Sequence, residues 1–493
     1  NTVLVPAQWD LIEPEEGKID FNIIDEVVQQ AEDHHLKVVF LWFGAWKNSM
    51  SCYAPLWFKQ DIKRFPRAMN AQGKPLEIAS AFSDNVLKAD QKAFGKLMQH
   101  IKDVDKQQTV VMVQVENEIG MLEDARDRSP LAEKAYKQIV PVELVKSLNK
   151  RRGTRLQIGK TWAETFGTDR YADEKFMAYH YAVYVEQIAQ VAKKVYPLPL
   201  YVNAAMNSRG RRPGEYPSAG PLAHLKDIWQ YAAPSIALLA PDLYDNGFKS
   251  WVSRYALPDN PLFIPEVRYG DYSGARALYV FGEYDCLGYS PFSIDNPASS
   301  ASTNLASSYQ LLHQMMPMIL YAQGQKNKKK WGVLLDKTTK DTTIVDGDIV
   351  MKCSHSYTLP WGTHPDEWPE VGAMIIKLAE NDYLIAGSGI VTVFRHQSEL
   401  SQSEKRQLGE DGFALAGSDN HTSANDTRWN GNCIGLGTVD EVTIGTDGSL
   451  NYVRRLNGDQ THQGRHVDLG DWRILHVKLY NYSYYPYSLY FAF

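Results

Sequence analysis

The chain has 493 residues, of which 44% are hydrophobic and 22% are charged. A chain of this length exceeds what one ordinary core can hold, so two or more domains are expected. The net charge of −6 and the pI near 6.1 give no support for nucleic-acid binding, which favours basic surfaces. No apolar run reaches the length of a membrane span, so we expect a globular protein without a membrane-spanning segment.

Aromatic residues make up 12% of the chain, with 12 Trp and 28 Tyr. Aromatic rings stack on the flat C–H faces of sugars, which favours a carbohydrate substrate modestly, although large β-rich proteins also hold many aromatic residues. The four cysteines, Cys52, Cys286, Cys353 and Cys433, are widely spaced and form no CxxC pair. This spacing argues against a zinc site and a disulfide scaffold. We expect buried free thiols, with one bridge left open, and neither a metal nor a cofactor.

Short apolar runs alternate with segments of helical spacing through the first two thirds of the chain. The runs predict strands at residues 2–5, 38–42, 109–115, 200–202, 236–240, 261–264 and 286–289. Helices are predicted at about residues 23–31, 86–102, 174–195, 274–281 and 304–323. Repeated β–α units of this kind indicate a parallel sheet with helical crossovers, and hence an α/β fold of the (β/α)₈ TIM-barrel type.

A (β/α)₈ barrel has eight strands, whereas the sequence supplies seven, beginning with what should be the second. A barrel that lacks one strand would expose two sheet edges, a state that proteins avoid. We therefore expect that the natural N-terminus is absent here, together with the first βα unit and any signal peptide.

The pattern changes after the lysine-rich stretch at residues 325–330, where helical spacing fades and short alternating runs follow. Such runs, at residues 374–378, 383–386, 390–394 and 472–477, are typical of a β-sandwich. The sequence therefore predicts a catalytic barrel over residues 1–324 and a sandwich-like domain over residues 331–493. We expect the second domain to cover one side of the barrel, and sugar binding is the alternative role.

Glu118 ends the apolar segment at residues 109–118. Successive strand residues point to opposite faces, so Glu116 and Glu118 are expected to face the barrel interior together, with Asn117 on the opposite face. Two inward carboxylates on one strand are unfavourable unless they are paired or functional. A carboxylate at the C-terminal end of a barrel strand is where this fold holds its catalytic groups. The alternative is a surface hairpin whose glutamates are solvated.

Glu266 ends a second apolar run, directly after Pro265. Pro lacks a backbone donor and occurs at strand ends, which favours placing Glu266 at the rim of the sheet. Arg268 and Tyr269 follow, and a cation and a phenol there would hold the carboxylate ionised. The alternative is a surface pair of Arg268 with Glu266.

Two further aromatic residues are candidates for the same end of the barrel. Tyr244 ends the strand that precedes Glu266 and would lie within hydrogen-bonding reach of it. Trp46 follows the run at residues 38–42 and would face the mouth as a stacking platform for a sugar. Either ring could instead belong to the core.

The run Gln-Val-Glu-Asn-Glu-Ile-Gly at residues 114–120 resembles the acid/base motif of family 35 glycoside hydrolases, β-galactosidases of the large retaining (β/α)₈ clan. Residues 5–9 and 13–21 resemble that family's second-strand segment. Glu266 lies where the family's nucleophile would be, and residues 288–292 resemble the last-strand region of bacterial β-galactosidases of this clan. The resemblance covers residues 1–320 and is strongest to a bacterial branch with a β-rich C-terminal domain. One departure is Phe-Gly-Ala-Trp at residues 43–46 in place of Cys-Ala-Glu-Trp, whose glutamate contacts the galactose in that family; this weakens the assignment to galactose more than the assignment to hydrolysis.

The resemblance implies a retaining exo-β-galactosidase in which Glu118 is the acid/base and Glu266 the nucleophile. Asn117 would bind the sugar 2-hydroxyl, Tyr244 would orient Glu266, and Trp46 and Tyr269 would line the pocket. The expected substrate is an oligosaccharide or plant polysaccharide, and the expected location is periplasmic or secreted. Two alternatives stay open: a β-glycosidase of other preference, such as a β-glucosidase or an α-L-arabinopyranosidase, and a non-catalytic carbohydrate-binding barrel. The sequence also leaves homo-oligomer formation open.

Overall fold

The computed structural model describes residues 1–207, 210–295, 300–323, 325–359, 365–399, 432–456, 458–462, 464 and 466–483. The chain forms two compact units. The first unit consists of residues 1–268 and 286–292, and the second of residues 269–285 and 293–493.

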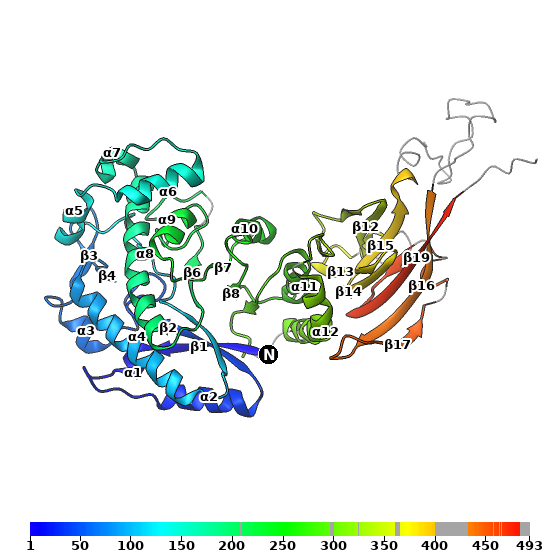
Figure 1. The fold of residues 1–493 in the computed structure, drawn as a ribbon, viewed down its shortest axis with the longest axis horizontal. Helices are drawn as coiled ribbons and strands as arrows, with labels where there is room; N and C mark the ends of the chain where they lie inside the picture. The colour runs from blue at the N-terminus through cyan, green and yellow to red at the C-terminus, as the bar shows by residue number, and fades with distance from the viewer. Residues whose placement is uncertain are drawn as a thin grey trace, which may run out of the picture. The chain divides into compact units, whose positions relative to one another are not determined.

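The first unit is built on a seven-stranded sheet whose paired strands are all parallel (Figure 1). The strands, in sheet order, are β1 (Thr2–Gln8), β2 (Lys37–Phe43), β5 (Val110–Gln114), β6 (Leu200–Ala205), β7 (Leu238–Leu243), β8 (Ile264–Val267) and β9 (Tyr289–Pro291). All seven predicted strands are confirmed, and β7, β8 and β9 begin two or three residues later than predicted. The seven strands form a nearly closed barrel, which stays open between β1 and β9 because, within the described part of the chain, each of these two strands pairs on one side only.

Alternating burial along β2 separates the two sides of this barrel. Val39, Leu41 and Phe43 belong to a small interior cluster that also includes residues of β6 and β7. Val38, Phe40 and Trp42 point the other way and join the larger core under the helices. Both faces of the strand are therefore buried, as is usual for parallel sheets covered by helical crossovers.

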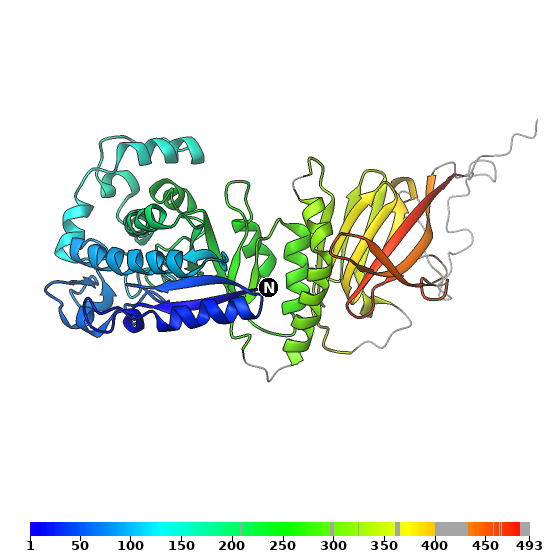
Figure 2. The same ribbon diagram turned by 60° about the horizontal axis from the view of Figure 1, so that its bottom comes forward.

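The helices of the first unit supply the outer layer. They are α1 (Trp9–Ile12), α2 (Asn22–Asp33), α3 (Leu56–Gln60), α4 (Asp84–Val104), α5 (Pro130–Tyr136), α6 (Val142–Arg152), α7 (Trp162–Phe166), α8 (Arg170–Val195), α9 (Lys226–Ala232) and α10 (Phe248–Tyr255), with a hairpin of β3 (Arg67–Met69) and β4 (Pro75–Ala79). Both views show α2 and α4, in blue, lying alongside the first strands (Figure 1, Figure 2). Ser83 and Asp169 cap α4 and α8 by accepting backbone N–H groups of their first turns, the preferred arrangement at helix starts. None of the helices in the described ranges is long and apolar enough to cross a membrane.

The described residues of the second unit include the two helices α11 (Ser273–Glu283) and α12 (Ser300–Ala322) and two antiparallel sheets. The two helices pack against each other (Figure 2). One sheet has the order β10 (Lys330–Leu335), β13 (Val371–Ala379), β14 (Asp382–Ser388), β19 (Arg473–Ser483), β16 (Asn432–Ile444) and β17 (Leu450–Arg455). The other has the order β11 (Asp341–Asp346), β12 (Ile349–His355), β15 (Ile390–His396) and β18 (Val467–Asp468), with a 3₁₀ turn at Ser356–Thr358.

The two sheets share one hydrophobic core. Residues from both, including Met351 of β12 and Ile385 of β14, are fully buried in it. The predicted sandwich-like pairing of β-sheets is therefore confirmed. All four cysteines are free, and those at positions 286 and 353 are buried, as expected for free thiols.

Candidate active site

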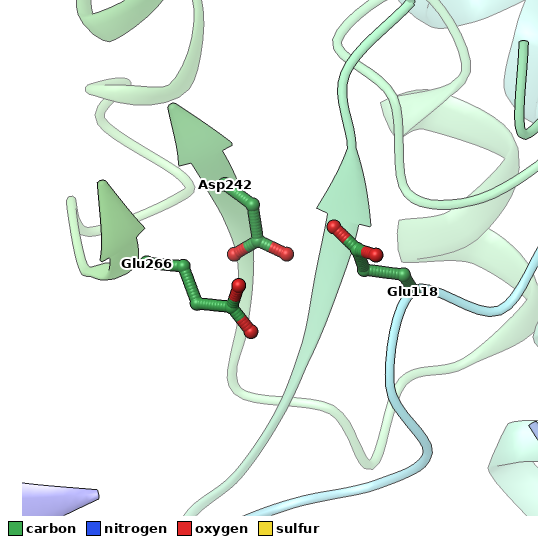
Figure 3. A group of neighbouring side chains, drawn as sticks. All are labelled: Glu118, Asp242 and Glu266. Atoms are coloured by element: carbon green, nitrogen blue, oxygen red, sulfur yellow. The ribbon is translucent and has the colours of Figure 1, made fainter. Parts of the chain in front are cut away.

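Glu118 and Glu266 meet at the C-terminal end of the barrel. Glu118 lies four residues beyond the last residue of β5, and Glu266 lies near the end of β8. Together with Asp242 of β7 they form a group in which one oxygen of each residue lies within 4.8 Å of the others (Figure 3). The two glutamates are 148 residues apart in sequence, so the fold of the parallel sheet and of the turn beyond β5 brings them together.

Two left-handed residues bring Asn117 into this site. Glu116 has φ 59° and Glu118 has φ 46°, a conformation that few non-glycine residues adopt. The predicted alternation therefore fails after Gln114: the side chain of Asn117 reaches Glu266, whereas that of Glu116 turns away toward α4. Backbone strain of this kind persists where surrounding contacts hold it, and it is common at functional sites.

A buried pair of acids holds this turn from behind. The carboxyls of Glu116 and Asp90 are hydrogen-bonded to each other, and both are fully buried. Glu116 accepts the backbone N–H of Trp46 at 2.7 Å, while Asp90 accepts from the Trp42 indole at 2.8 Å and the Tyr184 hydroxyl at 2.8 Å. Burial raises the pKa of both carboxyls, and the facing carboxyl raises that of Glu116 further. The pair is therefore expected to hold a shared proton.

This pair predicts how stability depends on pH. The pKa values of Glu116 and Asp90 are raised in the folded chain, so the folded chain keeps a proton that the unfolded chain releases above about pH 4. The free energy of unfolding therefore falls as the pH rises from about 4 toward the raised pKa. Glu116→Gln supplies a neutral amide that can donate to Asp90. We expect its free energy of unfolding to fall less with pH than that of the wild type, measured by urea titration at several values between about pH 5 and pH 8. Parallel curves for the two proteins would contradict the shared proton.

Asp242 is the third carboxyl of the site, and the sequence analysis did not identify it. It is 1% exposed, and its Oδ2 accepts the Asn203 side-chain N–H at 2.7 Å. The Oδ1 atom of Asn203 accepts the backbone N–H of Glu118 at 2.9 Å, so one amide from β6 links the turn beyond β5 to β7. A signal was present in the sequence, because Asp242 and Asn203 each follow an apolar run, as the two glutamates do.

Glu266 is held by two donors. The Tyr244 hydroxyl donates to Oε2 at 2.7 Å, and the Asn117 amide donates to Oε1 at 3.3 Å. The contact predicted between Tyr244 and Glu266 is thus present. Arg268 does not fill the role expected of it, because its Nε donates to the backbone carbonyl of Tyr244 at 3.1 Å. Tyrosine and amide donors, rather than that cation, accompany the Glu266 carboxylate.

Burial and crowding change the protonation of the other two carboxyls. Burial is the main cause that raises the pKa of Glu118, and the charge of Glu266 raises it further. The hydrogen bond from Asp242 and the charge of Lys47 oppose these effects. The pKa of Asp242 is raised more strongly, first by burial and then by the charges of Glu266 and Glu118. A raised pKa is what a general acid requires at neutral pH.

Two predicted substrate-binding residues have other surroundings. Trp46 is fully buried and packs edge-on against Tyr181 and Tyr184 of α8, so it cannot offer a ring face to a sugar. The stacking prediction for Trp46 was therefore wrong; its backbone instead binds Glu116 and, through its carbonyl, the N–H of Asn117. Tyr269 is half-buried and belongs to the second unit, and its role in the pocket stays a prediction.

The three carboxyls also raise the question of a metal ion. Carboxylate oxygens suit Mg²⁺ and Ca²⁺, which take about six or more oxygen ligands. Here the groups next to the carboxyls are hydrogen-bond donors, namely the Tyr244 hydroxyl and the amides of Asn117 and Asn203. These donors form hydrogen bonds with the carboxyl oxygens and would not coordinate a cation through their N–H or O–H groups. The arrangement is therefore better suited to acid–base chemistry.

Two family models match parts of the chain. The model of glycoside hydrolase family 42, described as a β-galactosidase, matches residues 3–174, a range that includes Glu118 and ends before Glu266. A domain of unknown function, DUF5597, matches residues 305–468. This match supports the predicted glycoside hydrolase, whereas the predicted assignment to family 35 is contradicted, because the model that matches is that of family 42. No curated protein is similar enough in sequence to count as a match.

Several solved structures are similar to part of the chain. They include a β-galactosidase from Bacillus circulans sp. alkalophilus, with 14% identity, a TM-score of 0.46 and coverage of 65% of this chain and 53% of that one. A catalytic mutant of a family 42 β-galactosidase from G. stearothermophilus has 16% identity, a TM-score of 0.45 and coverage of 65% and 53%. The catalytic domain of a β-amylase from Paenibacillus polymyxa has 10% identity, a TM-score of 0.45 and coverage of 62% and 91%. The chain thus spans about half the length of these β-galactosidases.

Proposed function

We propose that the chain is a retaining exo-β-galactosidase that removes terminal β-galactosyl residues from oligosaccharides or plant polysaccharides, in a periplasmic or secreted setting. The observation that carries the proposal is the spacing of Glu118 and Glu266, whose nearest oxygens lie within 4.8 Å. Retaining glycosidases hold their carboxyl groups about 5–5.5 Å apart, whereas inverting enzymes need about 6.5–9.5 Å to admit a water. The description of the matching family model supports galactose as the sugar.

In the first step, an Oε atom of Glu266 attacks the anomeric carbon and the bond from that carbon to the glycosidic oxygen breaks. Glu118 gives its proton to the departing oxygen, which leaves as an alcohol, and Glu118 becomes a carboxylate. Tyr244 and Asn117 hold the attacking carboxylate in place. The Asn117 side-chain oxygen is buried without a protein partner, which suits a bond from the sugar 2-hydroxyl.

In the second step, a water takes the place of the departed alcohol. Glu118 accepts a proton from this water, the water oxygen bonds to the anomeric carbon, and the bond to Glu266 breaks. Two inversions at the same carbon give a product with the original β configuration. Glu118 ends protonated and Glu266 ends ionised, so the site is ready for another cycle.

The proposal is tested with a panel of p-nitrophenyl glycosides and with NMR of the first-formed sugar. We expect the β-galactoside to have the highest kcat/KM, by roughly tenfold or more over the β-glucoside, since a misplaced hydroxyl leaves polar groups unpaired. The first anomer observed should be β. An α anomer would contradict retention, and sugar binding without turnover would favour the non-catalytic barrel.

One observation favours testing a second sugar, an α-L-arabinopyranoside. Residues 43–46 contain no glutamate, and Ala45 and Trp46 instead support Glu116 through their backbone. This segment therefore supplies no carboxylate to a galactose hydroxyl. If the α-L-arabinopyranoside, which lacks the sugar C6 group, is hydrolysed fastest, the enzyme is an arabinopyranosidase with the same catalytic pair.

A further inference from the structure

Asp242 lies between the two proposed catalytic carboxyls and has no charge partner of opposite sign in its hydrogen bonds. Its carboxyl is hydrogen-bonded to that of Glu118, and its Oδ2 accepts from the amide of Asn203 (Figure 3). The other oxygen, Oδ1, is buried without a donor. An ionised carboxylate with one buried, undonated oxygen is strongly unfavourable, whereas a protonated carboxyl in the same place has a proton to give.

The charge of the whole group leads to the same conclusion. Three carboxyls within 4.8 Å cannot all ionise, because each added charge is repelled by the others in a buried site. Glu266 has two donors, from Tyr244 and Asn117, and is the carboxyl best suited to carry one negative charge. Glu118 must hold its proton to act as an acid. If the group carries a single negative charge, on Glu266, the remaining carboxyl, that of Asp242, is neutral as well.

We propose that Asp242 stays protonated through the catalytic cycle and donates its hydrogen bond to Glu118 whenever Glu118 has given up its proton. This inference rests on the proposed function and adds to it a fixed, neutral donor. The single negative charge is on Glu266 in the resting enzyme. It moves to Glu118 when Glu266 becomes an ester and the alcohol leaves with the proton, and it returns when water supplies a proton to Glu118. Asp242 is a positioning residue, since it acts through Glu118.

The surroundings of Asp242 support a neutral state. The titratable groups that face it come from four strands or strand ends and one helix: Glu118, Tyr201 of β6, Tyr244, Glu266 of β8 and Tyr255 of α10. The tyrosines are neutral at ordinary pH, and burial raises their pKa values further. The charge of Lys47 acts on Glu118, and Arg268 donates to the backbone carbonyl of Tyr244.

Two substitutions at Asp242 distinguish whether this residue acts as a neutral hydrogen-bond donor or as a charged carboxylate. Asp242→Asn keeps a neutral group that accepts from Asn203 and donates to Glu118, so we expect kcat/KM for the phenyl β-galactoside within about fivefold of the wild type. Asp242→Leu keeps the volume but removes the donor, and we expect a loss of roughly ten- to a hundredfold, the worth of one hydrogen bond to a charged group. Circular dichroism and thermal unfolding of both variants show whether each is folded.

The pH dependence of kcat/KM and its dependence on the leaving group would not change if Asp242 had only a structural role. Without the donor, the Glu118 carboxylate is harder to form, so the alkaline limb of kcat/KM should move to higher pH in Asp242→Leu and stay in place in Asp242→Asn. The loss in Asp242→Leu should nearly vanish with a dinitrophenyl galactoside, whose leaving group needs no proton. If folded Asp242→Asn is as impaired as Asp242→Leu, the charge of Asp242 matters and the inference is overturned.

An infrared measurement tests the proton without turnover. The difference spectrum of wild type minus Asp242→Asn, recorded without substrate on protein labelled with ¹³C-aspartate, should contain the C=O band of a protonated carboxyl at neutral pH. Its absence overturns the inference even in an enzyme that hydrolyses galactosides. Conversely, its presence in a protein that hydrolyses no glycoside supports the protonated Asp242 while the proposed function fails.

Discussion

Glu266→Gly is expected to abolish hydrolysis of β-galactosides, with a fall in kcat on the order of 10⁵-fold, the scale seen when an enzyme loses its nucleophile. The neighbouring side chains are not expected to replace it, because Tyr244 and Asn117 carry no negative charge and the Glu118 and Asp242 carboxyls are proposed to be protonated. The cavity left by the side chain lies beside the anomeric carbon. Added azide should enter it, restore turnover of an activated galactoside, and give the α-galactosyl azide by a single inversion.

The protein itself should remain folded. Removing Glu266 takes the one negative charge out of a group of three buried carboxyls, and the unfavourable burial of that charge is relieved, which offsets the two donors left without an acceptor. The thermal unfolding midpoint is therefore expected to stay close to that of the wild type. Glu123→Gly is a matched control, because Glu123 is exposed and has φ 72°, a backbone conformation that glycine adopts readily. Undiminished turnover in folded Glu266→Gly, or a β-galactosyl azide product, would refute the nucleophile.

The barrel could be predicted because its evidence is local in the sequence. Each strand is a short apolar run, and helices such as α2 show apolar residues at helical spacing, with Ile24, Val28 and Ala31 buried. The positions of Glu118 and Glu266 followed from one rule, that polar residues just after barrel strands meet at the same end. Because β8 begins later than predicted, Glu266 lies within the strand rather than after it, still near its C-terminal end.

The rest of the site depends on contacts between distant segments, which no local pattern encodes. Glu116 and Asp90 are in different elements, and only the packing of α4 against the end of β5 makes them a buried pair. That pair and the left-handed backbone of Glu116 and Glu118 turn the Asn117 side chain into the site. The prediction from strand alternation was therefore wrong for residues 116–118. Trp46 was misjudged for a related reason, because α8 covers it with Tyr181 and Tyr184.

Glu118→Gln is the second substitution with a large expected effect, and its size should depend on the leaving group. The amide cannot give a proton to the glycosidic oxygen, so kcat/KM for a galactoside with a poor leaving group should fall by about 10²- to 10⁴-fold. A dinitrophenyl galactoside needs no such proton, and its first step should be nearly unaffected. Its second step should be slow, since the introduced amide cannot accept a proton from water, and stopped-flow measurement should show a burst of dinitrophenol followed by slow turnover.

A smaller residue at the same position completes the assignment of roles. Glu118→Ala opens the side of the intermediate from which water attacks, so azide should react there and give the β-galactosyl azide, the opposite anomer to that from Glu266→Gly. The two products together fix which carboxyl lies on which face of the sugar. If Glu118→Gln slowed poor and activated substrates equally and gave no burst, Glu118 would be a binding residue. The proton for the leaving oxygen would then have to come from Asp242, the other carboxyl of this group whose pKa is raised by burial.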